Sequence, residues 1–341
     1  MDRLVVDGWG KFVGKEDNRI VVKEKGSKLH QEVAEDLRQV VITGGGSISF
    51  DALKLLGKNG VDLVVIDWKG KVTAKLSSPE MRTVSTRKEQ YFAYKDERSV
   101  ELAKSYVAAK MKNQYALLGT WAKTRKDTRP TEADDLMRFR RAVSDMIDNL
   151  DDLEGKHIED VRDSLIGLEG KCSTFYWDGF SEIIRADFEF KKRSGRNAED
   201  GVNAMLNYGY ALLEGEVHRA IHFAGLDPYG GYLHADRPGK PSLVLDLMEE
   251  FRQQVVDRKV MSMVQKGEVT PSDFKIKEGQ CWLPDRIRKN LIKKILGKME
   301  DYVKWKDRKI RWSDLILKQA RNTGKYLRGE TNEYEYFYLR W

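Results

Sequence analysis

Cysteine is nearly absent from this sequence of 341 residues, which contains only Cys172 and Cys281. Two isolated cysteines exclude a disulfide framework and a cysteine-rich zinc site. No apolar run approaches the ~18 residues that a membrane span needs. The first apolar run, Leu4–Val6, stops at Asp7, which excludes a signal-peptide core. We therefore expect a soluble, cytoplasmic protein that does not contact a membrane.

Two familiar motifs are also incomplete. His218 and His222 have the i, i+4 spacing of a zinc-binding helix, but no glutamate lies between them. Core or surface histidines are the favoured interpretation, because such a pair without a third ligand proves little. The glycine triplet 44–46 lacks the Gly-Lys-Ser/Thr ending of a phosphate-binding loop, so it predicts a tight turn.

What the chain does contain is apolar residues, 40% of the total, and an uneven distribution of charge. The net charge is +7, but the segment from Cys281 to Arg328 has 15 Lys/Arg and 5 Asp/Glu, a balance of +10 that leaves −3 for the rest. A basic block on a near-neutral body indicates a polyanionic partner, most often nucleic acid. The alternative is a set of solvated helix faces, which charge alone leaves open.

The first ~75 residues predict strands separated by turns. Glu16–Asn18 has the composition of a hairpin turn, and the continuous apolar run Val61–Ile66 predicts a strand buried on both faces. One short helix interrupts the strands, with Ser49 or Asp51 as its cap and Gly57 near its end. The predicted strands are Leu4–Val6, Lys11–Val13, Ile20–Val22, Val40–Ile42, Val61–Ile66 and Lys71–Leu76.

From Ser99 onward the apolar spacing is helical. The predicted helices after the first are 133–150, 158–180, 201–224, 242–263, 284–301 and 312–327. A chain of this length suggests two domains at ~150 residues each. Strands followed by helices predict an α+β protein with a β-domain joined to an all-α domain. The change in composition near Ser77–Pro79 marks the boundary.

Three features can carry chemistry. His234 lies in a loop fixed by glycines and prolines, and such loops often present functional side chains. Asp246 and Glu249 lie side by side on the next predicted helix, where they repel unless a cation or water separates them; a solvated acidic edge is the alternative. Glu169 lies between Gly167 and Gly170, and two glycines in a helix indicate close approach by another chain or a ligand.

Carboxylates and an imidazole together can hold a hard divalent cation. Mixed oxygen and nitrogen ligands suit Mg²⁺ or Mn²⁺ better than a structural Zn²⁺. The sequence therefore predicts a divalent metal site of this composition.

Four segments occur together in this chain: 167–170 (Gly-Leu-Glu-Gly), 203–210, the loop around His234, and 246–252. In combination they resemble the universal CRISPR-associated integrase, the endonuclease subunit that inserts new spacers during prokaryotic antiviral defence. The resemblance covers nearly the whole chain. The opening strands, the helix around 48–56 and the strand 62–67 are similar to the β-domain of that family.

The resemblance implies a domain arrangement and partners. It implies a sandwich-like, β-rich N-terminal dimerisation domain over residues 1–76, a linker over 77–86, and a helical catalytic domain over 87–341 that binds metal and DNA. It also implies a homodimer. Two such dimers bridge a small ferredoxin-like partner, the second CRISPR-associated adaptation protein.

The metal ligands of the family correspond to Glu169, His234 and Glu249. Some members have Asp in place of the last ligand, so Asp246, one turn earlier, is the alternative; we rank it as a residue that supports the ligands. A divalent ion stabilises charge on a phosphodiester and aligns the nucleophile. In integration the nucleophile is the 3′-hydroxyl of incoming DNA, and with water the same site hydrolyses DNA. A second role for His234 is proton transfer, which a near-neutral pKa allows.

Candidate DNA-binding residues follow from charge and aromatic character. Phosphate contacts give affinity independent of sequence, which suits an enzyme that accepts foreign double-stranded or branched DNA. Tyr208 and Tyr210 can stack on a splayed base or belong to the core. Arg252 and Arg258 follow the acidic pair. The predicted basic helix contributes Arg286, Lys289, Lys293, Lys294 and Lys298.

Two alternatives to an integrase remain. One is a general metal-dependent nuclease that cuts branched DNA during repair. The other is a DNA-binding scaffold of the same fold that has lost catalysis, although the complete set of Glu169, His234 and Glu249 argues against loss. Strand joining with a free 3′-hydroxyl separates the integrase from the repair nuclease.

Overall fold

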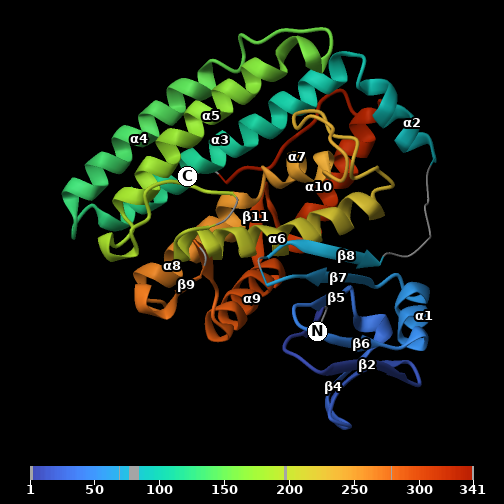
Figure 1. The fold of residues 1–341 in the computed structure, drawn as a ribbon. Helices are drawn as coiled ribbons and strands as arrows, with labels where there is room; N and C mark the ends of the chain where they lie inside the picture. Colours follow the sequence, from blue (N-terminus) through green and yellow to red (C-terminus); the bar gives the residue numbers. More distant parts are fainter. Residues whose placement is uncertain (1–2, 69, 77–83, 196–197, 278, 340–341) are drawn as a thin grey trace. The chain divides into compact units, whose positions relative to one another are not determined.

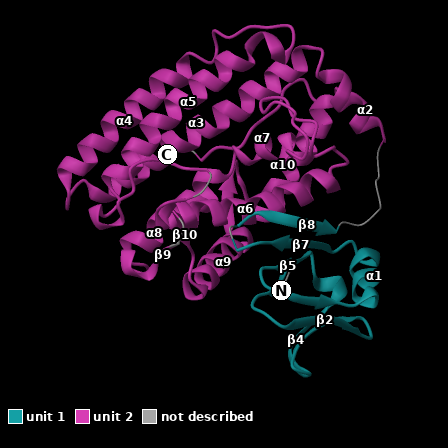
Figure 2. Ribbon diagram, viewed as in Figure 1, with its two compact units in different colours: residues 1–82 teal, residues 83–341 magenta. Residues whose placement is uncertain are grey.

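The computed structural model describes residues 3–68, 70–76, 84–195, 198–277 and 279–339. By its internal contacts the chain divides into two compact units, which Figure 2 colours separately. Unit 1 comprises residues 1–82 and unit 2 comprises residues 83–341. Most of the predicted linker, residues 77–83, lies outside the described residues, and its predicted end is wrong because helix α2 already begins at Val84.

The described part of unit 1 contains two four-stranded sheets, one α-helix and a short 3-10 helix, Ala34–Asp36. The first sheet has the order β1-β5-β7-β8, with parallel pairs except for the antiparallel β7–β8 edge. The second has the order β4-β3-β2-β6, with β2–β6 the parallel pair. The bounds are β1 Arg3–Val6, β2 Lys11–Glu16, β3 Arg19–Glu24, β4 Ser27–Val33, β5 Gln39–Ile42, β6 Gly46–Ile48, α1 Phe50–Lys58, β7 Asp62–Ile66 and β8 Val72–Leu76.

The core of unit 1 is formed by side chains from both sheets and from α1. Leu4 of β1, Ile20 of β3 and Val40 of β5 belong to one buried apolar cluster, together with Ala52 and Leu56 of α1. Helix α1 begins as predicted, because the Ser49 hydroxyl accepts a hydrogen bond from the Ala52 amide at 3.1 Å. All six predicted strands are confirmed. The sequence did not predict β4 and β6, whose residues are mostly exposed and lack an apolar run.

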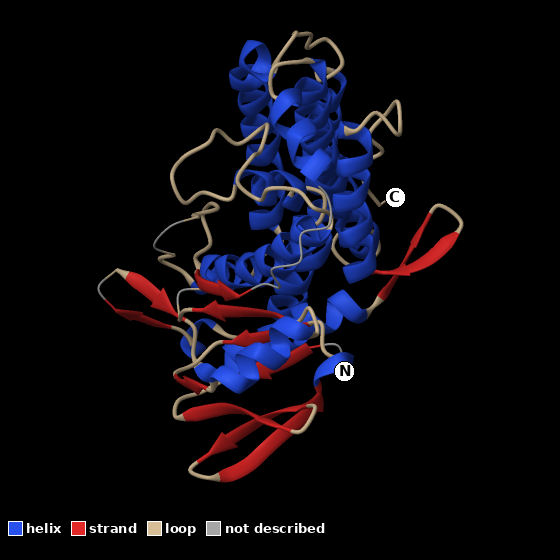
Figure 3. Ribbon diagram, turned by 90° about the vertical axis from the view of Figure 1, so that its right-hand side faces the viewer, coloured by secondary structure: helices blue, strands red, loops and turns tan. Residues whose placement is uncertain are grey.

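Unit 2 is mainly helical, as Figures 1 and 3 show. The long helices α3, α4 and α5 pack along one another, and α6 packs against α7, α9 and α10. The bounds are α2 Val84–Ala93, α3 Glu97–Arg125, α4 Pro130–Asp148, α5 Ile158–Glu182, α6 Gly201–Phe223, α7 Ser242–Met248, α8 Arg258–Gln265, α9 Asp285–Glu300 and α10 Trp312–Leu327. None of the helices in this described part combines the length and apolar character that crossing a bilayer requires.

The expectation that the second domain is all-α is wrong in two places. Strands β9 (Lys275–Lys277) and β10 (Gln280–Trp282) form one antiparallel hairpin. Strands β11 (Tyr302–Trp305) and β12 (Arg308–Arg311) form another inside the basic segment. The second hairpin turns at Lys306, which adopts φ +53°. Lysine rarely adopts this left-handed conformation. The turn also lacks the Asn-Gly or Asp-Gly pair that would have marked a hairpin turn in the sequence.

The single helix predicted over residues 242–263 is also wrong. Helix α7 ends at Met248, and a π-helical turn, Gln253–Asp257, precedes α8. Glu249 and Glu250 follow α7 directly at the break and are 3% and 0% exposed. Buried carboxylates need polar partners, which the periodicity of a single segment does not reveal. Single-turn π-helices are often found at functional sites.

Candidate functional site

The loop that carries His234 is fixed against α2 and the start of α7. The side-chain amide of Gln90 donates to the carbonyl oxygens of Asp227 at 2.8 Å and Gly230 at 2.7 Å. Gly231 is required by close packing, because a Cβ there would lie 2.6 Å from the backbone of Ser242. The loop therefore presents His234 from a rigid position, as its glycines predicted.

Asp246 on α7 holds this histidine. Its Oδ2 accepts the backbone N–H groups of Tyr232 at 2.6 Å and Leu233 at 3.0 Å, and its Oδ1 accepts the N–H of His234 at 3.0 Å. The same Oδ1 lies 2.7 Å from the Nδ1 of His234. Because a carboxylate is an acceptor, Nδ1 donates in this contact, and Nε2 is the ring nitrogen that takes no part in it. The four donors occupy both oxygens of Asp246, which favours an orienting role over direct metal ligation.

Glu249 caps the C-terminus of α7 and is buried in a cationic setting. Its two oxygens lie 3.2 Å from the Nε of Arg252 and 3.0 Å from the Nζ of Lys110. Burial alone would raise the pKa of Glu249, but Arg252, Lys110 and His234 outweigh it and lower the pKa to about 2. The alternative of a solvated acidic edge is therefore wrong, and Glu249 is a buried, ionised carboxylate.

Glu169 on α5 faces the same cation. Its carboxylate forms an ion pair with Lys110 and accepts a hydrogen bond from the Ser173 hydroxyl at 2.8 Å. The side-chain amide of Gln114 in turn donates to Ser173 at 3.3 Å. A Cβ at Gly167 or at Gly170 would meet no atom of the described chain within 4 Å. The close approach that the two glycines predicted is therefore not made by any described segment of this chain.

Lys110 of α3 is the residue that joins the two carboxylates. Its side chain is 14% exposed, and its ammonium group contacts both Glu169 and Glu249. Burial lowers the pKa of Lys110, and the two carboxylates raise it by more, so the net shift is upward. The ammonium group is charged and supplies the cation that two neighbouring carboxylates require.

These residues agree with the chemistry of a divalent metal site. Glu169, Glu249 and an imidazole nitrogen of His234 have the oxygen and nitrogen donor types that suit Mg²⁺ or Mn²⁺. Within the described residues, however, no group of three or more His, Cys, Asp or Glu side chains is arranged closely enough to hold a metal ion. The ammonium group of Lys110 pairs with both glutamates in this structure, so a metal ion bound by the two carboxylates would have to displace it.

A cavity of about 230 Å³ lies beside this cluster. Its lining includes Lys110, Glu249, Arg252 and, from the α5–α6 connection, Arg193. Tyr210 lies between two guanidinium groups, with its ring centre 5.1 Å from Arg193 and 4.9 Å from Arg252. Three cations facing one cavity can hold a phosphodiester next to the carboxylates.

The two tyrosines proposed to stack on a base are buried in α6. Tyr208 is 0% exposed, so the core alternative fits it. Tyr210 is 8% exposed, and its hydroxyl donates to Asp257, which also accepts a hydrogen bond from Tyr176 at 2.8 Å. Tyr210 lines the cavity, but its ring faces are covered by Arg193 and Arg252 rather than open to a base.

The basic residues predicted to contact DNA differ in their surroundings. Arg258 of α8 and the α9 residues Lys289 and Lys293 are exposed. Arg286 pairs with Asp273, and Lys294 lies 3.0 Å from Glu268. Lys298 lies 4.7 Å from the ring centre of Trp312, and burial lowers its pKa to about 8. The segment is thus only partly a free cationic surface.

Sequence analysis missed Lys110, Gln114 and Arg193. A signal for the first two was present, because Lys110, Asn113 and Gln114 are polar residues on a helix that is otherwise strongly buried. Polar residues that interrupt an apolar helix face indicate buried partners. Arg193 carried no such signal, because it lies in a connection without regular periodicity.

Comparison with known proteins places these observations in a family context. Residues 4–296 match the family described as CRISPR associated protein Cas1. The CRISPR-associated endonuclease Cas1 1 of Archaeoglobus fulgidus is 45% identical, over 99% of this chain and 100% of the relative. A casposase bound to an integration product has a TM-score of 0.83 at 26% identity, over 98% of this chain and 93% of that chain. A chain of a Cas6-RT-Cas1–Cas2 complex shares the fold, with a TM-score of 0.78 at 19% identity over 98% of this chain and 36% of that chain.

Proposed function

The chain belongs to the CRISPR-associated Cas1 family, and we propose that it is a metal-dependent DNA endonuclease and integrase that inserts spacer DNA into a CRISPR array. The observation that carries the proposal is the pair Glu169 and Glu249 on one cation, with an oriented His234 beside them. The endonuclease from Archaeoglobus fulgidus and the casposase on an integration product support both the nuclease and the joining activity.

In the proposed mechanism Glu169, His234 and Glu249 hold a Mg²⁺ or Mn²⁺ ion. When bound, such an ion stabilises charge on the phosphodiester and aligns the attacking 3′-hydroxyl. Asp246 holds the imidazole through Nδ1, so Nε2 is the nitrogen that would bind the ion. Arg252 and Arg193 neutralise the phosphate that enters the cavity. Because burial of Glu249 is offset by cations, its carboxylate stays ionised and ready to bind metal.

The proposed partners are DNA, a second copy of the chain, and the small ferredoxin-like adaptation protein. We assign self-association to a sandwich-like unit 1, the β-rich domain predicted over 1–76. What supports this assignment is that unit 1 exposes several large apolar residues, among them Trp9 at 83% and Phe50 at 81%. Such residues are candidates for burial at an interface between chains. Unit 2 carries catalysis and binds double-stranded or branched DNA through its exposed cations.

A general repair nuclease is the second candidate function, since the same site hydrolyses DNA when water is the nucleophile. The cationic cavity serves either reaction. Joining is the discriminating activity, because it requires that a 3′-hydroxyl be bound in line with the target phosphate. The casposase relationship favours joining.

The test is to replace Glu169, His234 and Glu249 individually by Ala in the full chain. Each variant is expected to lose Mn²⁺-dependent cleavage and joining by at least ~100-fold, with duplex binding retained. Asp163→Ala is the matched control, because Asp163 is an exposed acid on the same helix as Glu169. Full turnover by His234→Ala would remove that residue from the ligand set, and joining without divalent cation would refute metal dependence.

A further inference from the structure

The C-terminal segment after α10 is anchored by a buried acid that catalysis does not use. Glu250 is 0% exposed and accepts hydrogen bonds from the Tyr334 hydroxyl, the Phe337 backbone N–H at 2.7 Å and the Gln319 amide at 2.8 Å. Phe337 is buried and stacks on Phe251 with ring centres 5.8 Å apart. The segment is therefore held in one position, next to the turn that carries Glu249.

Asn113 of α3 clamps the same segment from the other side. Its side-chain amide donates to the carbonyl oxygens of Glu250 at 3.0 Å and Phe337 at 3.2 Å, and its Oδ1 accepts the Leu339 N–H at 3.1 Å. With Phe337 directed into the core, its neighbours Tyr336 and Tyr338 remain half-buried at the surface. The anchoring thus fixes two tyrosine rings beside α3.

Tyr338 borders a cavity of about 480 Å³ whose lining shares no residue with that of the catalytic cavity. The Lys112 ammonium lies 5.0 Å from the centre of each ring, Tyr336 and Tyr338, and 2.6 Å from the Tyr336 hydroxyl. In the same lining the Arg140 guanidinium lies 3.8 Å from the centre of the Tyr115 ring, a stacking distance. The lining residues are Lys112, Tyr115, Arg140, Ser144, Ile147, Tyr338 and Leu339.

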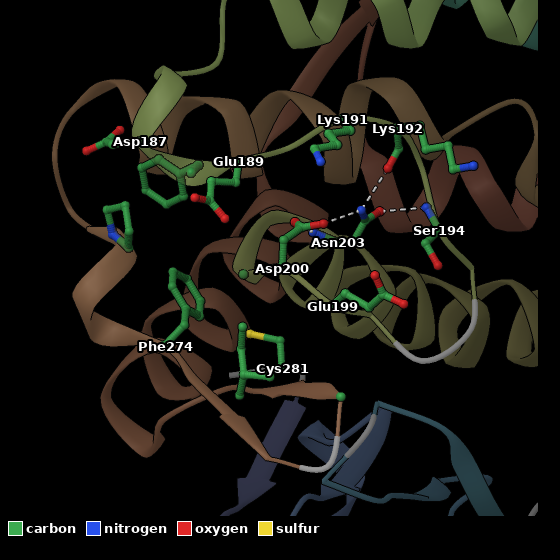
Figure 4. A pocket seen from close by; sticks show the side chains of 15 residues that line it. Asp187, Glu189, Lys191, Lys192, Ser194, Glu199, Asp200, Asn203, Phe274 and Cys281 are labelled. Atoms are coloured by element: carbon green, nitrogen blue, oxygen red, sulfur yellow. Dashed lines mark hydrogen bonds between the residues drawn. The ribbon is translucent and has the colours of Figure 1, made fainter.

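This lining contains two cations and no carboxylate, which distinguishes it from a larger cavity in unit 2. That cavity, of about 760 Å³, has four acids on its walls: Asp187, Glu189, Glu199 and Asp200. Figure 4 shows these acids together with Lys191 and Lys192. A phosphate would be repelled by the acid-rich walls and attracted to the cavity of Lys112 and Arg140. A volume near 480 Å³ lies in the range of small-molecule sites.

We propose that the cavity of Lys112, Arg140 and Tyr338 binds an unpaired nucleotide of a DNA strand, an inference that rests on the proposed action on DNA. Lys112 contacts the phosphate, and the base packs against the ring of Tyr338. Binding sites for single-stranded DNA combine aromatic rings, on which bases stack, with cations that contact the phosphates. Stacking of this kind tolerates any sequence, because every base has a π face. A paired base is stacked within the duplex and cannot enter a concave site, so the nucleotide must be unpaired.

The experiment measures binding of the full chain to a labelled single-stranded oligonucleotide and to a blunt duplex. Tyr338→Leu is expected to weaken binding of the single strand by about tenfold, the loss of one stacked base, and to leave duplex affinity unchanged. Tyr338→Phe is the matched control, because it keeps the ring and loses only the hydroxyl. Lys112→Gln is expected to reduce the salt slope for the single strand by about 0.7, with Lys123→Gln, an exposed lysine on the same helix, as its control.

A 2-aminopurine base in the unpaired strand gives a second readout, since stacking on a ring quenches its fluorescence. Quenching by the parent and by Tyr338→Phe, but not by Tyr338→Leu, is the expected pattern. Equal single-strand affinity and equal quenching for Tyr338→Leu and the parent would overturn the proposal. Joining of blunt duplexes by the parent protein is scored separately, so a failure of the proposed catalysis is distinguishable from a failure of this site.

Discussion

Lys110 pairs with both glutamates of the proposed metal site, so its removal is the most informative perturbation of that site. The replacement Lys110→Met keeps much of the buried apolar stem and deletes the charge. Without divalent cation, Glu169 and Glu249 then face each other with only Arg252 nearby as an ion-pair partner of Glu249. We expect the variant to be unstable without metal and to recover when Mn²⁺ is added.

The magnitude follows from the contact distance. At the 3.0 Å that separates Lys110 from Glu249, two unit charges attract by about 5 kcal/mol at an effective dielectric constant near 20. Removing one partner of a buried ion pair typically costs about 3–5 kcal/mol. For a domain of this size each kcal/mol changes the melting temperature by roughly 2–4 °C. Without metal, Lys110→Met should therefore melt about 10 °C below the parent protein.

Metal binding should change in the opposite direction. The parent must displace the Lys110 ammonium before an ion reaches both glutamates, and the variant has no such competitor. We expect Lys110→Met to bind Mn²⁺ at least about tenfold more tightly, which corresponds to about 1.4 kcal/mol. Calorimetric titration and thermal melting with and without Mn²⁺ measure both effects, with Lys123→Met as the control on the exposed face of α3. Weaker Mn²⁺ binding by Lys110→Met, or an unchanged melting temperature without metal, would refute the competition.

Four further outcomes are expected. Asp246→Ala should lower Mn²⁺ affinity by about 10- to 100-fold, less than Glu249→Ala, because it releases the imidazole without removing a ligand; equal losses in a titration would make Asp246 a ligand. Lys293→Gln should reduce the salt slope of duplex binding by about 0.9 and Lys294→Gln by less, since Glu268 already pairs with Lys294; equal slopes would contradict this. Trp9→Glu should shift the full chain from dimer to monomer in sedimentation, and an unchanged dimer would place the contact elsewhere. Burial raises the pKa of Asp257 in the folded protein from 3.8 to about 6, so the stability that this residue contributes falls as pH rises from about 4 to 6. In denaturant titrations over that interval, the stability of Asp257→Asn should therefore rise by up to about 3 kcal/mol relative to the parent. A difference between the two proteins that does not change with pH would contradict the raised pKa.

Local patterns predicted the elements well where the sequence carries their signals. The helix expected over 312–327 has those bounds in the structure, and the helix expected over 158–180 begins at Ile158 and ends two residues later, at Glu182. Apolar periodicity and capping are properties of the segment itself, which is why these predictions succeed. Strand β4 was missed because its residues face solvent and its position depends on pairing with β3. Pairing partners are not visible in the periodicity of a single segment.

The candidate site was predictable in its acids and histidine but not in its cations. Glu169 and His234 stand out by their local glycines, whereas Lys110 stands out only as a polar residue on an apolar helix, which indicates a buried partner without naming it. Its role depends on α5 and on the turn after α7, both distant in sequence. The two tyrosines predicted to stack on a base show the opposite problem: the sequence pointed to them, but it could not assign their role. Aromatic residues on a helix have the same spacing in the sequence whether they lie in a core or on a binding surface. Tertiary packing decides between the two, and it places Tyr208 in the core.

Asp246, Glu249, Glu250 and Asp257 lie within twelve positions of one another but have different surroundings. The groups that donate hydrogen bonds or ion pairs to each carboxylate, rather than its place in the sequence, determine its role. Asp246 accepts three backbone N–H groups and an imidazole, Glu250 accepts bonds from uncharged groups, and burial raises the pKa of Glu250 to about 7. Asp257 accepts two phenols. Only Glu249 is held by cations, Lys110 and Arg252. A flexible ammonium can be exchanged for another cation, whereas backbone donors cannot leave, so of the four acids Glu249 has the surroundings that best fit the metal-binding role proposed for it.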